Sequence, residues 1–284
     1  MYYAPMPLTT ADSPFTDEEF IFEPKIDGHR LLLSRSRGRT RLYTGQLADC
    51  TLQYPELLPI AADDIVLDGE VAATDAAGRI DGEAVKKRLA LRDPGRIRQA
   101  AAADPVNYIV FDILRYKGAD LRGLPLYQRK RILSGIRFGN PYIAQIPYIE
   151  EEGERLFREI QQRRWEGIVA KHSNSIYVIN QTGAWQAIIN WSEAEVVVTG
   201  YRKSGSGLLV AAASKNGALQ PAGVVADGLT ARHKMTLYRV RDALFTGEDG
   251  EWVYLAPLLK ARVNMRGWTK AGQLRSPVFA AFVR

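Results

Sequence analysis

The sequence of 284 residues is 46% hydrophobic and 25% charged, a balance typical of one or two folded globular domains rather than of a disordered chain. Its single cysteine, Cys50, excludes an intrachain disulfide and a thiolate metal cluster, and no stretch approaches the roughly 18 apolar residues that cross a bilayer. The net charge of +6 favours an anionic partner, and no secretion signal is visible, so we expect a cytoplasmic protein without membrane contact.

Short apolar strands dominate the first 190 residues. Residues 19–34 predict two strands around a loop that contains Pro24 and Gly28. Four further strand-like runs follow, at residues 41–44, 65–73, 108–114 and 167–171. Two helical patterns interrupt them, at residues 82–91 and 151–165, and the second ends with Arg163 and Arg164, which suits the helix dipole. Connections of mostly hairpin length favour an α+β domain built on antiparallel sheets.

From about residue 194 the sequence changes to short β-rich runs separated by turn signals such as Asn216-Gly217. The runs lie at residues 196–201, 207–213, 219–225 and 252–255. They predict a small β-barrel, and the OB-fold is a common barrel that binds nucleic acid on one face. We therefore predict two domains, residues 1–190 and 191–284. The second holds 13 Lys and Arg against 7 Asp and Glu, whereas the first holds 25 of each, so phosphate contacts are expected in the barrel.

One lysine stands in a setting that suits nucleophilic chemistry. The segment Lys25-Ile26-Asp27-Gly28-His29-Arg30 places Lys25 between two strands, with a carboxylate two residues later and an arginine five residues later. An amine attacks phosphorus only in its neutral form, which neighbouring cations favour. Taken alone, the segment is also typical of a surface turn. The sequence has no P-loop and no dinucleotide fingerprint, so any use of ATP requires another kind of site.

Three more segments follow the lysine segment in order along the chain. They are Leu67-Asp68-Gly69-Glu70-Val71, Ile109-Val110-Phe111-Asp112-Ile113-Leu114 and Glu166-Gly167-Ile168-Val169-Ala170-Lys171. The four segments together resemble the motif series of the ATP-dependent DNA ligases, which are covalent nucleotidyltransferases. The tail from Gly267 to Phe279 is similar to the end of the OB domain in bacterial end-joining ligases and small prophage ligases. The resemblance implies an ATP-grasp-like nucleotidyltransferase domain on antiparallel sheets, followed by an OB-fold β-barrel.

The resemblance assigns the central chemistry to the first motif. Lys25 would attack the α-phosphate of ATP, release pyrophosphate and hold AMP as a phosphoramide. Arg30 would contact the nucleotide and later the phosphate at the nick. Glu23 would lie beside the adenine, largely through its backbone.

The later motifs would complete the site. The resemblance implies that Glu70 binds the ribose or a metal, that Glu166 holds the catalytic metal, and that Phe111 stacks on adenine. Lys171 would face the α-phosphate. Without the resemblance, Glu70 is typical of a turn and Phe111 of a core. Two further acidic residues are more typical of turns or salt bridges than of catalysis, Asp68 and Asp112.

The sequence departs from the family pattern around the phosphate site. Gly45 stands where the family usually places an arginine, and Ala187 stands where relatives carry a lysine two residues after Trp185. No Lys or Arg occurs between Lys171 and Trp185, although the family commonly has an arginine there. Each missing contact removes about 2–4 kcal/mol of transition-state stabilisation by analogy with a lost oxyanion donor, so we expect weakened adenylylation.

The sequence therefore predicts an ATP-dependent DNA ligase that seals nicked or broken duplex DNA through a lysyl-AMP intermediate, with Mg²⁺ or Mn²⁺. We expect a monomer associated with a bacterial nucleoid, with a Ku-like end-binding partner. DNA contacts are predicted for Lys260, Lys270 and Arg275, which are equally typical of a solvated barrel surface. Two alternatives remain. One is an RNA ligase or capping-type nucleotidyltransferase, and the other, favoured by Gly45 and Ala187, is a non-catalytic protein that binds DNA nicks or ends.

Overall fold

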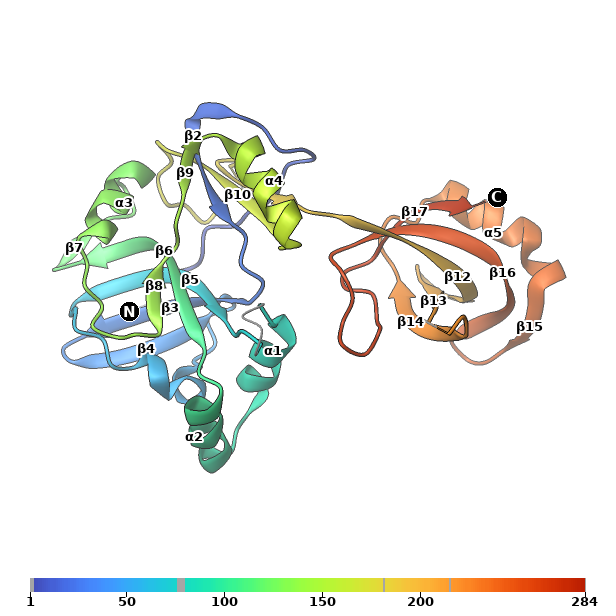
Figure 1. Cartoon of the computed structure of the whole chain (residues 1–284), viewed down its shortest axis with the longest axis horizontal. Helices are drawn as coiled ribbons and strands as arrows, with labels where there is room; N and C mark the ends of the chain where they lie inside the picture. Colours follow the sequence, from blue (N-terminus) through green and yellow to red (C-terminus); the bar gives the residue numbers. More distant parts are fainter. Residues whose placement is uncertain (1–2, 76–79, 181, 215, 284) are drawn as a thin grey trace. The chain divides into compact units, whose positions relative to one another are not determined.

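The computed structural model describes residues 3–75, 80–180, 182–214 and 216–283. The chain divides into two units, Met1–Asn190 and Trp191–Arg284 (Figure 1). Each unit has its own buried apolar core. No helix in these described ranges is long and apolar enough to cross a membrane.

The first unit is built on two mostly antiparallel sheets. One sheet has the strand order β1-β11-β10-β2-β9. Its strands are β1 (Thr9–Thr10), β2 (Asp17–Pro24), β9 (Ile149–Glu151), β10 (Gly167–His172) and β11 (Trp185–Ile189). The other has the order β4-β3-β5-β6-β7, with β8 beside β6. Its strands are β3 (His29–Ser36), β4 (Arg39–Thr44), β5 (Ile65–Ala72), β6 (Asn107–Tyr116), β7 (Ala119–Asp120) and β8 (Ile143–Gln145).

Helices surround these two sheets. They are α1 (Gly82–Ala90), α2 (Pro94–Ala103), α3 (Leu126–Ser134) and α4 (Gly153–Arg163), with 3₁₀ turns at Thr51–Gln53 and Pro55–Leu57. The sequence predicts α1 and α4 but not α2 and α3. Helix α4 is amphipathic: Leu156, Phe157 and Ile160 pack with Phe22 of β2 and Ile168 of β10. This packing fixes α4 against the sheet that carries the first motif.

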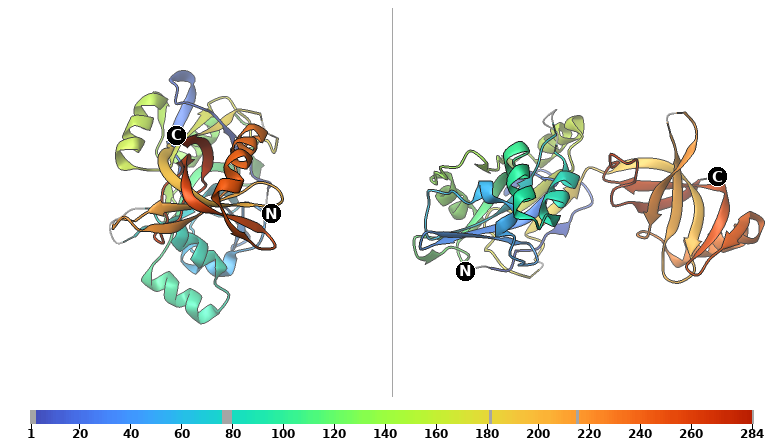
Figure 2. Two further views of the ribbon diagram at one scale, coloured as in Figure 1. Left: turned by 90° about the vertical axis from the view of Figure 1, so that its right-hand side faces the viewer. Right: turned by 90° about the horizontal axis from the view of Figure 1, so that it is seen from below.

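The second unit is a curled sheet with the order β14-β13-β12-β16-β15 and with β17 paired to β16 (Figure 2). Its strands are β12 (Ser192–Arg202), β13 (Leu208–Ala213), β14 (Leu219–Val225), β15 (Phe245–Glu248), β16 (Trp252–Met265) and β17 (Val278–Val283). Helix α5 (Ala231–Leu244), which the sequence does not predict, begins after Thr230, whose hydroxyl accepts from the N–H of His233. The architecture confirms the predicted α+β fold with an OB-fold after the nucleotidyltransferase domain.

Two glycines of the motifs permit close backbone approach. A Cβ atom on Gly28 would lie 1.9 Å from the carbonyl oxygen of Val71, and one on Gly167 would lie 2.1 Å from that of Ile188. Gly167 also has a φ of 151°, which side chains of L-residues rarely adopt. These positions therefore require glycine, and each lies close in sequence to a predicted site residue, Lys25 and Glu166.

Candidate active site

The neighbouring strands β2 and β10 set the long axis of the site. The N–H of Lys25, just past the end of β2, donates to the carbonyl of Gly167 at 2.8 Å. Glu23 of β2 pairs with Val169, and Lys171 lies two residues further along β10. Four residues of a strand span about 13 Å, so the backbone of Lys171 lies about that far along β10 from Gly167, the partner of Lys25.

The structure gathers the predicted residues of the motifs into one pocket. Its lining includes six of them, Glu23, Lys25, Arg30, Glu70, Phe111 and Lys171. The remaining one, Glu166, joins through an ion pair: Lys25 Nζ lies 2.9 Å from Glu166 Oε2. The two side chains are 19% and 6% exposed, respectively. The predicted nucleophile and the predicted metal ligand are therefore in direct contact, although 141 residues separate them.

Glu70 and Arg30 face each other across strands β5 and β3, where they form a register pair. Burial raises the pKa of the Glu70 carboxyl to about 8, although Lys25 and Arg30 act in the opposite direction. The nearby charge of Glu166 raises this pKa further. Glu70 therefore retains its proton near neutral pH in the absence of an added cation.

The Arg30 guanidinium is held by a buried network. Its Nε and one terminal nitrogen donate to the two oxygens of Asp68 at 3.0 and 2.6 Å, and its other donors reach the carbonyl of Met6 and the hydroxyl of Tyr177. Burial would lower the pKa of Arg30, but Asp68 outweighs burial and raises it. Four of the five N–H groups of the guanidinium are engaged in this way. A phosphate contact by Arg30 must use the remaining donor or replace one of these bonds.

Asp68 and Asp112 lie in buried salt bridges, as their sequence context favours. Asp68 pairs with Arg30, and Asp112 pairs with Arg129 at 2.9 Å, where both side chains are fully buried. Neither carboxylate lines the pocket. Both serve to anchor arginines.

Aromatic rings and a buried charge cluster form the other end of the pocket. The Lys171 ammonium lies 4.1 Å from the ring centroid of Phe111, 4.0 Å from that of Trp185 and 2.7 Å from Glu23 Oε2. Lys130 of α3 pairs with the second oxygen of Glu23. The predicted α-phosphate ligand Lys171 thus lies at the aromatic end, where a contact with a phosphate would have to replace its ion pair with Glu23.

The pocket and its immediate partners carry only a small cationic excess. Four cationic side chains are present, Lys25, Arg30, Lys130 and Lys171. Four carboxyl groups oppose them, Glu23, Asp68, Glu70 and Glu166, of which Glu70 is neutral near pH 7 because of its raised pKa. Since a nucleoside triphosphate carries several negative charges, this excess is small for receiving one.

Two of the three departures from the family pattern lie beside the pocket. The N–H of Gly45 donates to the carbonyl of Arg30 at 3.1 Å, and a Cβ atom there would be 3.6 Å from Arg30 Cβ. Ala187 of β11 pairs with Val169 and stands two residues from Trp185, so its side chain shares the strand face of Trp185. Val169 and Trp185 both line the pocket. A longer side chain at either position would start next to the site.

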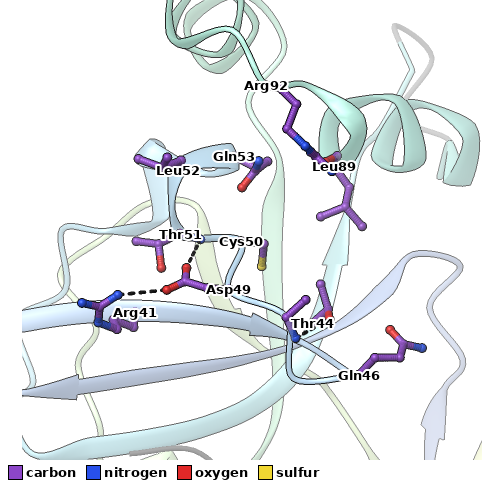
Figure 3. A pocket seen from close by; sticks show the side chains of 11 residues that line it. Arg41, Thr44, Gln46, Asp49, Cys50, Thr51, Leu52, Gln53, Leu89 and Arg92 are labelled. Carbon is purple, nitrogen blue, oxygen red and sulfur yellow. Dashed lines mark hydrogen bonds and ion pairs between the residues drawn. The ribbon is translucent and has the colours of Figure 1, made fainter.

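A wider hollow of about 780 Å³ lies between the segment after β4 and the end of α1 (Figure 3). Its lining includes Thr44 and Gln46, which flank Gly45, together with Cys50. The one ion pair drawn among its lining residues joins Arg41 to Asp49 at 2.9 Å. None of the predicted catalytic residues lines this hollow, so the smaller pocket around Lys25 is the candidate site.

The predicted DNA-binding residues lie in the second unit. Lys260 of β16 forms a cross-strand ion pair with Glu195 of β12 at 2.7 Å, and both side chains are about half exposed. Lys270 and Arg275 lie in the segment between β16 and β17, where the N–H of Arg275 donates to the carbonyl of Gly267. The pairing with Glu195 reduces the positive charge that Lys260 can offer a phosphate.

Several residues of the site lie outside the four motifs. Lys130 and Trp185 join the aromatic end, and Tyr177 and Met6 complete the Arg30 network. The chain segment of Met6 also supplies Leu8 to the pocket wall, and β1 after it pairs in parallel with β11. Of these residues, only Trp185 is part of the family resemblance.

Comparison with known proteins identifies the family. The model of the ATP-dependent DNA ligase domain family matches residues 8–186. The SPbeta prophage-derived DNA ligase-like protein LigB of Bacillus subtilis is 32% identical over 284 residues, which cover 99% of both proteins. The multifunctional non-homologous end joining DNA repair protein LigD of Mycobacterium tuberculosis is 30% identical over 280 residues, which cover 90% of this chain and 35% of LigD. The chain thus spans about a third of the length of LigD.

Solved structures give the same result. The crystal structure of the ligase domain from M. tuberculosis LigD shares 26% identity and a TM-score of 0.58, over 99% of this chain and 94% of that domain. A Lig E DNA ligase structure at 16% identity, with a TM-score of 0.67 over 100% of both chains, supports the fold. From the family match, the full-length similarity to LigB and the assembled motifs, the chain belongs to the ATP-dependent DNA ligase family.

Proposed function

We propose that this ligase seals nicks or breaks in duplex DNA through AMP bound covalently to Lys25. The observation that carries the proposal is the contact of Lys25 Nζ with Glu166 Oε2 at 2.9 Å, inside a pocket that also holds Glu23, Arg30 and Phe111. Among the lysines of the pocket, Lys25 is the one that stands beside Glu166, away from the aromatic rings that contact Lys171.

The first step uses the amine of Lys25, which the contact with Glu166 positions. The ammonium of Lys25 releases its proton to water, and the neutral Nζ then attacks the α-phosphorus of ATP. A bond forms between nitrogen and phosphorus, the bond from that phosphorus to the bridging oxygen breaks, and pyrophosphate leaves. The AMP group then passes to the 5′-phosphate of DNA, and a 3′-hydroxyl displaces AMP to seal the strand.

We infer that Glu70 and Glu166 hold a divalent metal ion. Among the described residues, no group of three or more His, Cys, Asp or Glu side chains is arranged to bind a metal. Two carboxylates nevertheless suit Mg²⁺, which keeps several waters and takes one or two carboxylates together with substrate phosphates. When bound, the ion neutralises charge on the phosphate oxygens.

The base lies at the aromatic end in this proposal. Phe111 supplies an aromatic ring for stacking once the Lys171 ammonium, 4.1 Å from the centroid of that ring, turns away to the phosphate. Glu23 lies next to this ring through the shared contact with Lys171. Arg30 remains assigned to the phosphates through its remaining donor. Lys171 remains assigned to the α-phosphate, which requires its side chain to exchange Glu23 for the phosphate.

We infer that DNA contacts come mainly from the second unit, including Lys260, Lys270 and Arg275. Its excess of basic over acidic residues supports this assignment, because phosphate neutralisation supplies most of the affinity of such contacts. The LigD relatives are described as non-homologous end joining proteins, so we also propose action on broken ends by a monomer, with a Ku-like partner.

A second candidate function is binding of nicks or ends without adenylylation. The small cationic excess around the pocket and the small residues Gly45 and Ala187 favour it, because a triphosphate then meets little net positive charge. ATP labelling distinguishes the two candidates.

The test is incubation with ATP labelled at the α-phosphate and Mg²⁺, followed by mapping of the labelled residue. We expect label on Lys25, its loss in Lys25→Ala, and its retention in Lys86→Ala, which changes an exposed lysine of α1. Labelling of Lys25→Ala at the level of the unmodified chain would place the nucleophile elsewhere. An unlabelled chain that still binds nicked DNA would favour the second candidate.

A further inference from the structure

Glu23 is a buried carboxylate whose two oxygens are taken by different lysines. Lys171 approaches one oxygen from the pocket, and Lys130 approaches the other from helix α3. The Lys130 and Glu23 side chains are 5% and 1% exposed. Lys130 does not itself line the pocket, whereas Glu23 and Lys171 do. We propose that Lys130 is a positioning residue that keeps Glu23 ionised and oriented, so that the pocket accepts a 6-aminopurine and rejects a 6-oxopurine.

The charges around Glu23 show why a second lysine matters. A carboxylate buried to this degree takes up a proton unless a cation compensates it. Burial would raise the pKa of Glu23, but Lys130 and, next, Lys171 outweigh burial and lower it. Lys171 is a variable partner, because it lines the pocket and would have to leave Glu23 to reach a phosphate. Lys130 is a constant partner, since it packs behind Glu23 near the Tyr148 ring.

The chemistry of purine edges makes the state of Glu23 selective. Adenine presents an amino group at position 6, which donates hydrogen bonds, whereas guanine presents an oxygen there, which accepts them. An ionised carboxylate only accepts, and it has lone pairs left after binding two ammonium groups. It therefore pairs with the amino group and repels the oxygen. If Glu23 gained a proton, it would become a donor and would tolerate the oxygen.

This inference rests on the proposed function for the identity of the nucleotide, but its test does not depend on labelling. The quantity measured is the ratio of dissociation constants for GTP and ATP, obtained by calorimetry on the whole chain. We expect Lys130→Met, which keeps the length of the side chain and removes its charge, to lower this ratio by about ten-fold or more. Lys130→Arg, which keeps the charge, should stay within about three-fold of the unmodified chain, as should Arg131→Met, which changes the exposed neighbour on α3.

A second comparison separates positioning from folding. Glu23→Gln should lower the ratio by itself, and adding Lys130→Met to it should lower the ratio no further, because Lys130 acts through Glu23. Equal weakening of ATP and GTP binding in Lys130→Met, or an unchanged ratio while Glu23→Gln alters it, would overturn the inference. An unmodified chain that binds the two nucleotides equally would do the same. A chain that prefers ATP in this manner but never acquires label would instead contradict the proposed lysyl-AMP chemistry and leave the inference standing.

Discussion

Restoring cations at Gly45 and Ala187 should accelerate the first step of the reaction. The pocket and its immediate partners carry only a small cationic excess, and each added cation changes their net charge by a full unit against the incoming triphosphate. An ammonium about 5 Å from a phosphate gains about 3 kcal/mol at an effective dielectric constant of about 20. The position of Ala187 is only 7% exposed, so desolvation removes part of this gain. We expect a net gain of about 1.4 kcal/mol, which is ten-fold in rate.

The structure accommodates a side chain at position 45. The backbone of Gly45 lies outside the left-handed region, and a Cβ atom there makes an ordinary contact with Arg30. We would measure the single-turnover rate of adenylylation for Ala187→Lys, Gly45→Arg and the double variant, with Ala187→Met as the uncharged control of similar length. A rise in Ala187→Lys of about ten-fold over Ala187→Met, and a larger rise in the double variant, is expected. Equal rates for Ala187→Lys and Ala187→Met would refute the argument from charge.

Three further outcomes are expected. Asp68→Asn should lower the free energy of unfolding in urea by about 3 kcal/mol or more, because it leaves Arg30 without its buried partner. Asp120→Asn, which changes an exposed ion pair, should lower it by less than about 1 kcal/mol, and similar values for both variants would show that the Arg30–Asp68 pair contributes no more than a surface pair. Burial lowers the pKa of Lys171 to about 8 from 10.5, so between these pH values the unfolded chain binds more protons than the folded chain, and the free energy of unfolding rises with pH. This rise should be absent in Lys171→Met, and the same rise in that variant would show that it does not come from Lys171. A chain ending at Asn190 should bind nicked DNA about ten-fold more weakly or worse, with a smaller salt dependence, and undiminished affinity would show that the basic second unit is not the main contact.

The sequence predicts the strands of the first unit better than its helices, for a physical reason. The predicted strands are continuous apolar runs, and they match β2, β3, β5, β6 and β10 within a few residues. Helix α3 is not predicted because its buried face includes Arg129 and Lys130, which interrupt the helical spacing of apolar residues. Helix α5 is not predicted because Leu237 is its one buried residue, so the helix has no apolar face to recognise in the sequence. In both helices the tertiary environment, rather than the local pattern, determines which side chains are covered.

The motifs predict which residues form the pocket but not how they are held. Lys25 and Glu166 belong to separate motifs, and the fold of a known family is needed to bring them together. The partners Lys130 and Tyr177 lie outside every motif, and no spacing relates them to Glu23 or Arg30. Long-range ion pairs of this kind depend on the packing of the sheets, which a single sequence does not specify.

The segment around Met6 has a consequence for how the protein matures. The N–H of Met6 donates to the hydroxyl of Tyr177, which lies 171 residues later in the chain, and β1 pairs with β11 later still. A ribosome that adds about 5–20 residues per second needs roughly 10 to 30 s to cover that distance. The wall that Leu8 contributes to the pocket therefore forms only after nearly the whole first unit has been synthesised. A growing chain would gain its nucleotide site in one late event, shortly before the second unit begins to emerge.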